Sequence, residues 1–173
     1  MTTVMTSADI ERSLRRLAHE ILEATVGADL ALVGIQTRGV PLAERLARNL
    51  NDIGGMPVPV GGLDISRHRD DRPAPMEAVQ SDLPFGITEK TVILVDDVLY
   101  TGRTARAALD ALIERGRPAA VRLVVLVDRG HRQLPVRADH VGKNLPTSRD
   151  QRVSVQVCEV DGVDQVLLEE VET

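Results

Sequence analysis

The sequence predicts an α/β protein in which a central parallel sheet is flanked by helices and followed by a small C-terminal hood. Two observations support this fold class. Apolar, β-branched runs alternate with segments of helical periodicity along most of the chain, and the alternation stops at about residue 134. At 173 residues and 43% apolar composition the chain can bury a full core. We therefore expect residues 1–173 to form a single domain.

The expected elements follow one another as helices and strands. The first helix has apolar residues at helical spacing, Ile10, Leu14, Leu17 and Ile21, after a possible N-terminal cap at Ser7. The next elements are a strand over 30–35, a helix over 41–50, strands over 58–65 and 92–95, a helix over 105–115 and a strand over 121–127. Strands separated by helices in this way pair in parallel.

Residues 134–173 are expected to form the hood, as short strands joined by turns at 144–146 and 161–162. The single cysteine, Cys158, lies in an alternating segment over 153–160, so we expect it to be a buried strand residue. One cysteine excludes an intramolecular disulfide and a cysteine-based metal cluster.

The composition bounds the class of function. The chain has no apolar stretch of membrane-spanning length and no signal-peptide pattern at its start, so we expect a cytoplasmic protein without a membrane partner. Only two residues besides histidine are aromatic, Phe85 and Tyr100, so stacking surfaces for bases are scarce.

The most informative motif spans residues 91–104, where a buried apolar strand is followed by Asp96 and Asp97. In open α/β sheets ligands bind beyond the carboxyl ends of the strands. Two carboxylates there can accept hydrogen bonds from ribose hydroxyls or lie near a hydrated Mg²⁺ ion. Each piece also has a simpler explanation, because paired aspartates can cap an ordinary strand–helix loop.

A small loop follows, and it opens a helix. Thr101, Gly102, Arg103 and Thr104 offer consecutive backbone N–H groups and two hydroxyls at the positive end of the helix dipole, which favours a phosphate. A Thr-Gly pair alone is compatible with an ordinary turn. The combination of apolar run, Asp-Asp, spacer and Thr-Gly-x-Thr matches the 5-phosphoribosyl-1-pyrophosphate (PRPP) signature of type I phosphoribosyltransferases.

A second candidate anion loop follows the first strand of the expected sheet. Thr37, Arg38 and Gly39 could present N–H groups and a guanidinium to a pyrophosphate, although the same residues also suit a plain connection. A polar, proline-containing stretch at about 64–80 predicts a flap, or alternatively a solvated hairpin tip. As a flap it would bring Arg67, Arg69 or Arg72 to the leaving group.

Residues 92–104, 127–139 and 141–148 together resemble the PyrR family of bifunctional pyrimidine operon regulators, and the similarity extends from Arg12 to about Val160. The resemblance implies a type I phosphoribosyltransferase fold, Mg²⁺ dependence, conversion of uracil and PRPP to UMP and pyrophosphate, and assembly into homodimers or larger homo-oligomers. It implies catalytic roles for Arg38, Asp96 and Asp97, and base contacts from Arg129 and Val153.

The same resemblance implies a longer set of PRPP- and UMP-binding residues. These are Thr37, Arg38, Gly39, Asp96, Asp97, Val98, Leu99, Tyr100, Thr101, Gly102, Arg103 and Thr104. Two positions depart from the family pattern: His68 stands where a tyrosine is usual in the flap, and His140 where an aromatic residue usually precedes Val-Gly-Lys-Asn.

Nucleic-acid binding is a separate question, because the net charge is −5. Residues 129–152 contain six Lys or Arg against two Asp, a local +4 that leaves −9 for the rest of the chain. The first helix carries a basic face, although solvated helix faces also have this pattern. The resemblance implies binding of the pyrimidine-operon mRNA leader through Arg15, His19, Arg132, Arg137 and Lys143.

Two alternatives stay open at this point. One is a phosphoribosyltransferase for another base, such as a purine, without an RNA function. The other is an RNA-binding regulator that has lost catalysis, against which the intact Arg38, Asp96 and Asp97 argue.

Overall fold

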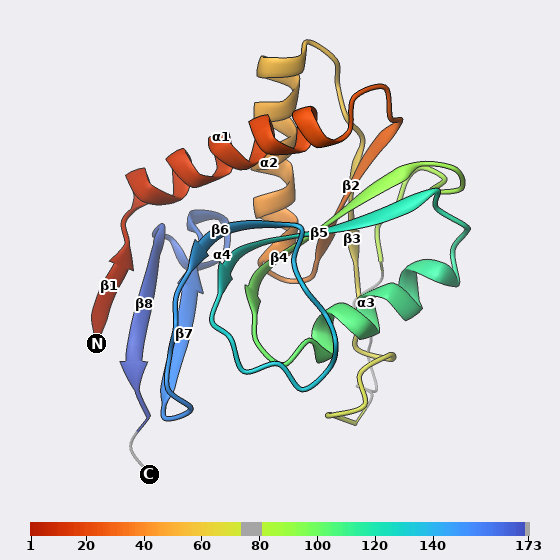
Figure 1. The fold of residues 1–173 in the computed structure, drawn as a ribbon. Coiled ribbons are helices and arrows are strands. Elements are labelled where there is room, and N and C mark those ends of the chain that lie inside the picture. Colours follow the sequence, from red (N-terminus) through yellow and green to blue (C-terminus); the bar gives the residue numbers. More distant parts are fainter. Residues whose placement is uncertain (74–80, 172–173) are drawn as a thin grey trace.

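The computed structural model describes residues 1–73 and 81–171, and its centre is a five-stranded parallel sheet (Figure 1). The strand order is β3-β2-β4-β5-β6. Their bounds are β2 Leu30–Ile35, β3 Val60–Leu63, β4 Thr91–Leu99, β5 Ala120–Asp128 and β6 His140–Asn144. The predicted central parallel sheet is confirmed.

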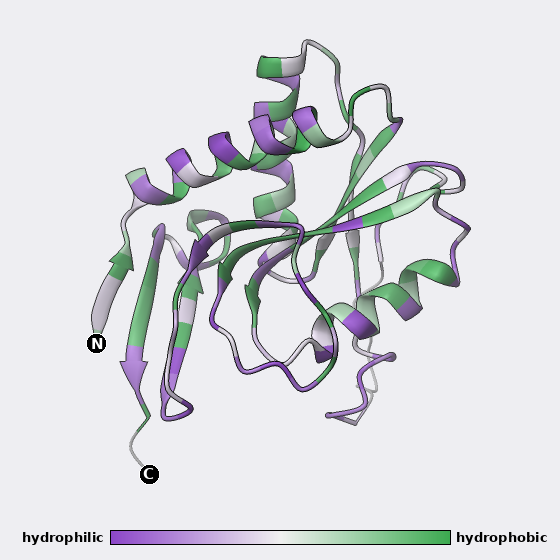
Figure 2. Cartoon of the chain, in the orientation of Figure 1, coloured by the Kyte–Doolittle hydropathy of each residue, from purple (hydrophilic) through white to green (hydrophobic). Residues whose placement is uncertain are grey.

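Helices cover both faces of this sheet. α1 (Ser7–Ala24) and α2 (Gly39–Gly54) lie on one face, and α3 (Arg103–Ile113) lies on the other (Figure 1). Successive residues of β4 alternate between the two cores: Ile93 and Val95 pack with α1 and α2, whereas Val92 and Leu94 pack with α3. Residues 92–95 of β4 are therefore buried on both faces of the sheet, as the sequence predicts, and Figure 2 shows hydrophobic colour along the strands of the central sheet.

The N-cap of the first helix lies one residue before the predicted one, and the helix begins at Ser7. Thr6, not Ser7, is the N-cap, and its hydroxyl accepts a hydrogen bond from the backbone N–H of Asp9. The Asp9 carboxylate accepts from the backbone N–H of Thr6, which completes a capping box. Asp9 at the third helical position therefore favours Thr6 as the cap in place of the predicted Ser7.

A second, antiparallel sheet has the order β1-β8-β7, with bounds β1 Thr2–Met5, β7 Gln151–Gln156 and β8 Gln165–Glu170. It differs from the expected hood in two ways. Residues 140–144, within the predicted hood, form β6 and extend the central sheet, and the N-terminal strand β1, which the sequence analysis did not predict, joins the hood sheet.

The prediction for Cys158 is wrong. Strand β7 ends at Gln156, and Cys158 begins the short helix α4 (Cys158–Asp161), where it is exposed. Gly162 ends that helix with a left-handed φ of 76°.

The strand that carries the acidic pair is longer than expected. β4 continues to Leu99, so Asp96 and Asp97 lie within the strand, and Asp96 pairs with Val125 of β5.

Within the two described ranges, no helix combines the length and the apolar character that a membrane crossing needs.

Candidate functional site

The two aspartates at the end of β4 have different environments. The backbone N–H of Asp97 donates to the Asp96 carboxylate at 2.9 Å, and the backbone N–H of Val98 donates to the Asp97 carboxylate at 2.8 Å. Burial, followed by the neighbouring charge of Asp97, raises the pKa of Asp96 well above its ordinary value. The pair therefore resists carrying two full charges until a positive charge approaches it.

The loop after β4 has the geometry of an anion site. Gly102 is the N-cap of α3 with a φ of 92°, a conformation that side chains rarely adopt. A Cβ atom there would also lie 3.1 Å from the Cβ atom of Val136. The Thr101 hydroxyl accepts a hydrogen bond from the backbone N–H of Arg103 at 3.3 Å. The N-terminus of α3 thus follows closely on the end of β4, and helix N-termini favour anions.

A cavity of about 390 Å³ lies over this loop. Most of its lining comes from residues that the sequence analysis assigned to PRPP and UMP, and the residues that it did not assign are Asp71, Ala105, Leu123, Val125 and Gln133. The assigned residues in the lining are Asp96, Val98, Leu99, Tyr100, Thr101, Gly102, Arg103 and Thr104, with Arg69 and Arg72 from the flap. The structure therefore brings Asp96, the anion loop and part of the flap to one cavity, whose lining does not include Asp97, Thr37, Arg38 or Gly39.

The described part of the predicted flap, residues 64–73, contacts the anion loop. The Arg69 guanidinium donates to the Thr104 hydroxyl at 3.0 Å, and the Arg103 guanidinium donates to Asp70 at 3.0 Å. Arg67 is exposed, and His68 lies 2.9 Å from Glu114. The remainder of the flap, 74–80, lies outside the described residues.

The second candidate loop joins β2 to α2, and it lies beside the first because β2 and β4 are neighbours in the sheet. The peptide bond between Gln36 and Thr37 is cis. A Cβ atom on Gly39 would lie 2.4 Å from the carbonyl oxygen of Val95, so glycine is required where the loop passes β4. Arg38 is the N-cap of α2. Two loops that each lead into a helix N-terminus thus lie at one edge of the sheet.

The Arg38 side chain is held by a residue that the sequence analysis missed. Its Nε and Nη2 atoms donate to the two carboxylate oxygens of Asp161 at 3.1 and 2.8 Å. These hydrogen bonds lower the pKa of Asp161. The two residues are 123 positions apart in the chain, so no local pattern could have joined them.

Of the two predicted base-contact residues, Arg129 lies against Tyr100, which lines the cavity. Arg129 is almost fully buried, and its guanidinium donates to the Thr147 hydroxyl and to the carbonyl oxygens of Ser148 and Gln151. The same guanidinium lies 4.0 Å from the centre of the Tyr100 ring. Val153 is half-buried on β7. The Arg129 side chain thus joins the anion loop to the hood.

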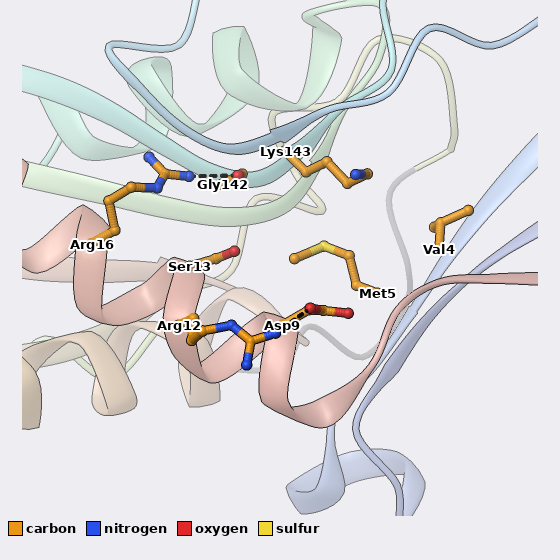
Figure 3. A pocket seen from close by; sticks show the side chains of 8 residues that line it. All are labelled: Val4, Met5, Asp9, Arg12, Ser13, Arg16, Gly142 and Lys143. Carbon is orange, nitrogen blue, oxygen red and sulfur yellow. Dashed lines mark hydrogen bonds and ion pairs between the residues drawn. The ribbon is translucent and has the colours of Figure 1, made fainter.

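Part of the predicted RNA surface is brought together by α1 and β6. Arg15 and His19 are exposed on α1, and Lys143 is exposed on β6. Arg16, from the same face of α1, donates to the carbonyl oxygen of Gly142 at 2.6 Å and fixes the helix to this strand. Figure 3 shows Lys143 across a pocket of about 340 Å³ from Arg12 and Arg16, with Asp9 at its rim.

The other two predicted RNA residues lie elsewhere. Arg132 donates to the carbonyl oxygens of Val136 and Tyr100, and its remaining nitrogen contacts Asp128 at 2.5 Å. It therefore braces the anion loop. Arg137 is exposed in the segment between β5 and β6.

The comparisons with known proteins agree with this geometry. Residues 3–161 match the family described as phosphoribosyl transferase domain. The hypoxanthine phosphoribosyltransferase of Trypanosoma cruzi superposes with a TM-score of 0.76 at 21% identity, covering 99% of this chain and 98% of that one. A hypoxanthine-guanine phosphoribosyltransferase from Bacillus anthracis gives a TM-score of 0.75 at 19% identity, covering 99% and 98%. At these identities the likeness concerns the fold alone.

Closer relatives carry the name bifunctional protein PyrR. The protein from Deinococcus deserti is 54% identical over 98% of this chain and 95% of its own length. The protein from Thermus aquaticus is 57% identical over 98% of this chain and 96% of its own length. With the domain match and these near-full-length identities, the chain belongs to the phosphoribosyl transferase domain family and, within it, to the PyrR proteins.

Proposed function

We propose that this protein transfers the phosphoribosyl group of PRPP to uracil, giving UMP and pyrophosphate, and that it also binds the leader of pyrimidine-operon mRNA. One observation carries the first activity. Two loops that each lead into the N-terminus of a helix, one after β2 and one after β4, lie at the same edge of the sheet beside Asp96 and Asp97. PRPP has a phosphate at one end and a pyrophosphate at the other, with a ribose diol between them.

The chemistry needs positioning and charge stabilisation more than a nucleophilic side chain. A ring nitrogen of uracil forms a bond to C1 of the ribose while the bond from C1 to pyrophosphate breaks, and the departing pyrophosphate or solvent accepts the proton of that nitrogen. The sugar gains cationic character in the transition state, which the carboxylates of Asp96 and Asp97 favour. Arg38 neutralises charge on the departing pyrophosphate. The N-terminus of α3 holds the 5′-phosphate throughout.

The donor set also suits Mg²⁺. Among the described residues no group of three or more acidic, histidine or cysteine side chains is placed to enclose a metal. Mg²⁺ commonly binds through one or two carboxylates, water and substrate phosphates instead. Asp96 and Asp97 would hold the ion through water, and the raised pKa of Asp96 fits a pair that awaits a cation. When bound, Mg²⁺ neutralises charge on the pyrophosphate.

The RNA activity rests on the relatives and on the basic surface of α1 and β6. Arg15, His19 and Lys143 are exposed there, and Arg137 is exposed on the segment that leads into β6. With few aromatic side chains, the protein would recognise a folded RNA loop through phosphate contacts and hydrogen bonds. We also propose assembly into homodimers or larger homo-oligomers.

A base panel tests the enzyme activity. We expect the protein, supplied with PRPP and MgCl₂, to convert uracil to UMP and to leave hypoxanthine and guanine unchanged. Turnover of hypoxanthine but not uracil would favour the purine alternative, for which the structural likeness to purine enzymes is fold-level only. A mobility-shift assay with the organism's own pyrimidine leader tests the RNA activity. RNA binding without uracil turnover would identify a regulator that has lost catalysis.

A further inference from the structure

Arg38 has a fixed direction in this structure because it forms a two-pronged contact with Asp161. The contact uses the Nε and Nη2 atoms of the guanidinium, at 3.1 and 2.8 Å. A planar guanidinium held along one edge by a carboxylate can rotate little. Its opposite edge, with Nη1, stays available to a ligand, and no other hydrogen-bond partner of Arg38 occurs in residues 1–73 and 81–171.

Asp161 is itself held in place. Its Oδ2 atom accepts a hydrogen bond at 2.8 Å from the backbone N–H of Val157, whose side chain is fully buried in the core. The helix α4 that contains Asp161 ends at once at Gly162. Contacts within the hood therefore fix the position of the Asp161 carboxylate, independently of the loop that carries Arg38.

The same short segment, residues 158–164, also contacts α2, the helix that follows Arg38. Arg45 of α2 contacts Glu159 and Asp164, the latter at 2.7 Å, and its side chain is mostly buried. Residues 158–164 thus dock onto α2 through one arginine and onto the loop at its start through another. Of these carboxylates, only Asp161 contacts a residue of the anion loops.

We propose that Asp161 is a positioning residue for pyrophosphate: it orients the Arg38 guanidinium toward the leaving group of PRPP. This inference rests on the proposed function, because it assigns the leaving group to the loop after β2. Asp161 contacts no reacting atom. Its effect should fall on ligands that carry a pyrophosphate, PRPP and pyrophosphate itself, and should spare UMP, which lacks one.

The test compares Asp161→Asn with wild type by titration calorimetry in MgCl₂, using pyrophosphate, PRPP and UMP as separate ligands. Asparagine keeps an oxygen for the Val157 N–H but removes the charge that holds Arg38. We expect the Kd for pyrophosphate and for PRPP to rise about tenfold, with the Kd for UMP changed by less than about twofold. In turnover, KM for PRPP should rise more than kcat falls.

Asp164→Asn is the matched control, since it removes a carboxylate from the same segment but one that contacts Arg45. It should leave pyrophosphate binding unchanged. A double variant, Arg38→Ala with Asp161→Asn, should bind pyrophosphate no more weakly than Arg38→Ala alone, because the effect of Asp161 passes through Arg38.

Three results would overturn the inference: unchanged pyrophosphate binding in Asp161→Asn, an equal loss of UMP binding, or the same loss in Asp164→Asn. Each can occur while the wild-type protein still converts uracil to UMP. Failure of the proposed function has a different signature, namely wild-type protein that binds no UMP and turns over no uracil.

Discussion

The Nη1 atom of Arg69 lies 3.0 Å from the hydroxyl oxygen of Thr104, so the segment over residues 64–73 contacts the loop that we assign to the 5′-phosphate. The sequence analysis expected the flap arginines at the leaving pyrophosphate, at the other end of PRPP. A fork of two hydrogen bonds to Asp71 keeps the Arg69 guanidinium in this position. Its charge is therefore available to the 5′-phosphate.

Replacing Arg69 with alanine should weaken UMP binding. We expect the Kd for UMP to rise about tenfold, which corresponds to the loss of one charge-assisted hydrogen bond. Pyrophosphate binding should change little, and calorimetry measures both. Arg115→Ala, an exposed arginine just beyond the end of α3, is the control for the lost charge. If Arg69→Ala lost pyrophosphate binding and kept UMP binding, Arg69 would instead contact the leaving pyrophosphate, as the sequence analysis expected.

Turnover and RNA binding should respond to different residues. Asp97→Asn removes a carboxylate beside the ribose, so we expect uracil turnover to fall by about 100-fold or more, with RNA affinity nearly unchanged. Arg137→Ala should weaken RNA binding and leave turnover nearly unchanged. A radiolabelled uracil assay and a mobility-shift assay on both variants measure the two effects. Equal loss of both activities in either variant would contradict separate sites.

The salt dependence of RNA binding tests Lys143, which lies across the pocket in Figure 3 from the arginines of α1. If its ammonium contacts one phosphate, Lys143→Ala should lower the slope of log affinity against log salt by about 0.7 to 0.9. Filter binding at several KCl concentrations gives the slope. The chain's only other lysine, Lys90, is the matched control, and its alanine variant should leave the slope unchanged. A wild-type slope in Lys143→Ala would place this residue outside the RNA contact.

The sequence predicted what depends on local pattern and missed what depends on long-range contact. The strand Leu30–Ile35 has the predicted bounds, because an apolar run between polar turns defines both of its ends. Cys158 was misplaced because period-two alternation continues past the end of β7 into a helical turn. β6 was placed in the hood because its five residues carry little apolar signal, and only pairing with β5 assigns it to the central sheet.

The candidate site follows the same rule. The acidic pair and the loop at Gly102 are contiguous in the chain, so a motif could predict them. The contact of Arg38 with Asp161 joins positions 123 residues apart, and it depends on how the hood packs on α2. The sequence around neither Arg38 nor Asp161 contains a pattern that predicts this contact.

The ion pair between Arg45 and Asp164 should contribute to stability above acidic pH. Hydrogen bonding to Arg45 is the largest cause that lowers the pKa of Asp164 from its ordinary value of 3.8. A lowered folded-state pKa gives stability that is fully present above 3.8 and is lost as the pH falls through the folded value. Asp164→Asn should therefore destabilise the protein by about 1 to 2 kcal/mol at pH 7.

Urea unfolding at pH 7 and at pH 3 measures this difference, which should shrink at the lower pH. Asp52→Asn is the control, because Asp52 is exposed on α2 and forms no ion pair within the described ranges. A difference between Asp164→Asn and wild type that does not depend on pH would show that packing, not charge, accounts for the effect.

Asp96 should show the opposite relation between charge and stability. Burial and the charge of Asp97 raise its pKa, so the folded state disfavours the ionised form. The resulting cost is absent below the ordinary value of 3.8 and grows as the pH rises through the folded-state pKa. Asparagine resembles the protonated acid and keeps an oxygen for the backbone N–H of Asp97.

We therefore expect Asp96→Asn to raise Tm by a few degrees at pH 8, to raise it less at pH 4, and to lower uracil turnover sharply. Differential scanning calorimetry at the two pH values and a turnover assay measure the three effects. A lower Tm at pH 8 would mean that the Asp96 charge stabilises the empty site, and the account of the acidic pair as a poised, incompletely ionised site would then be wrong.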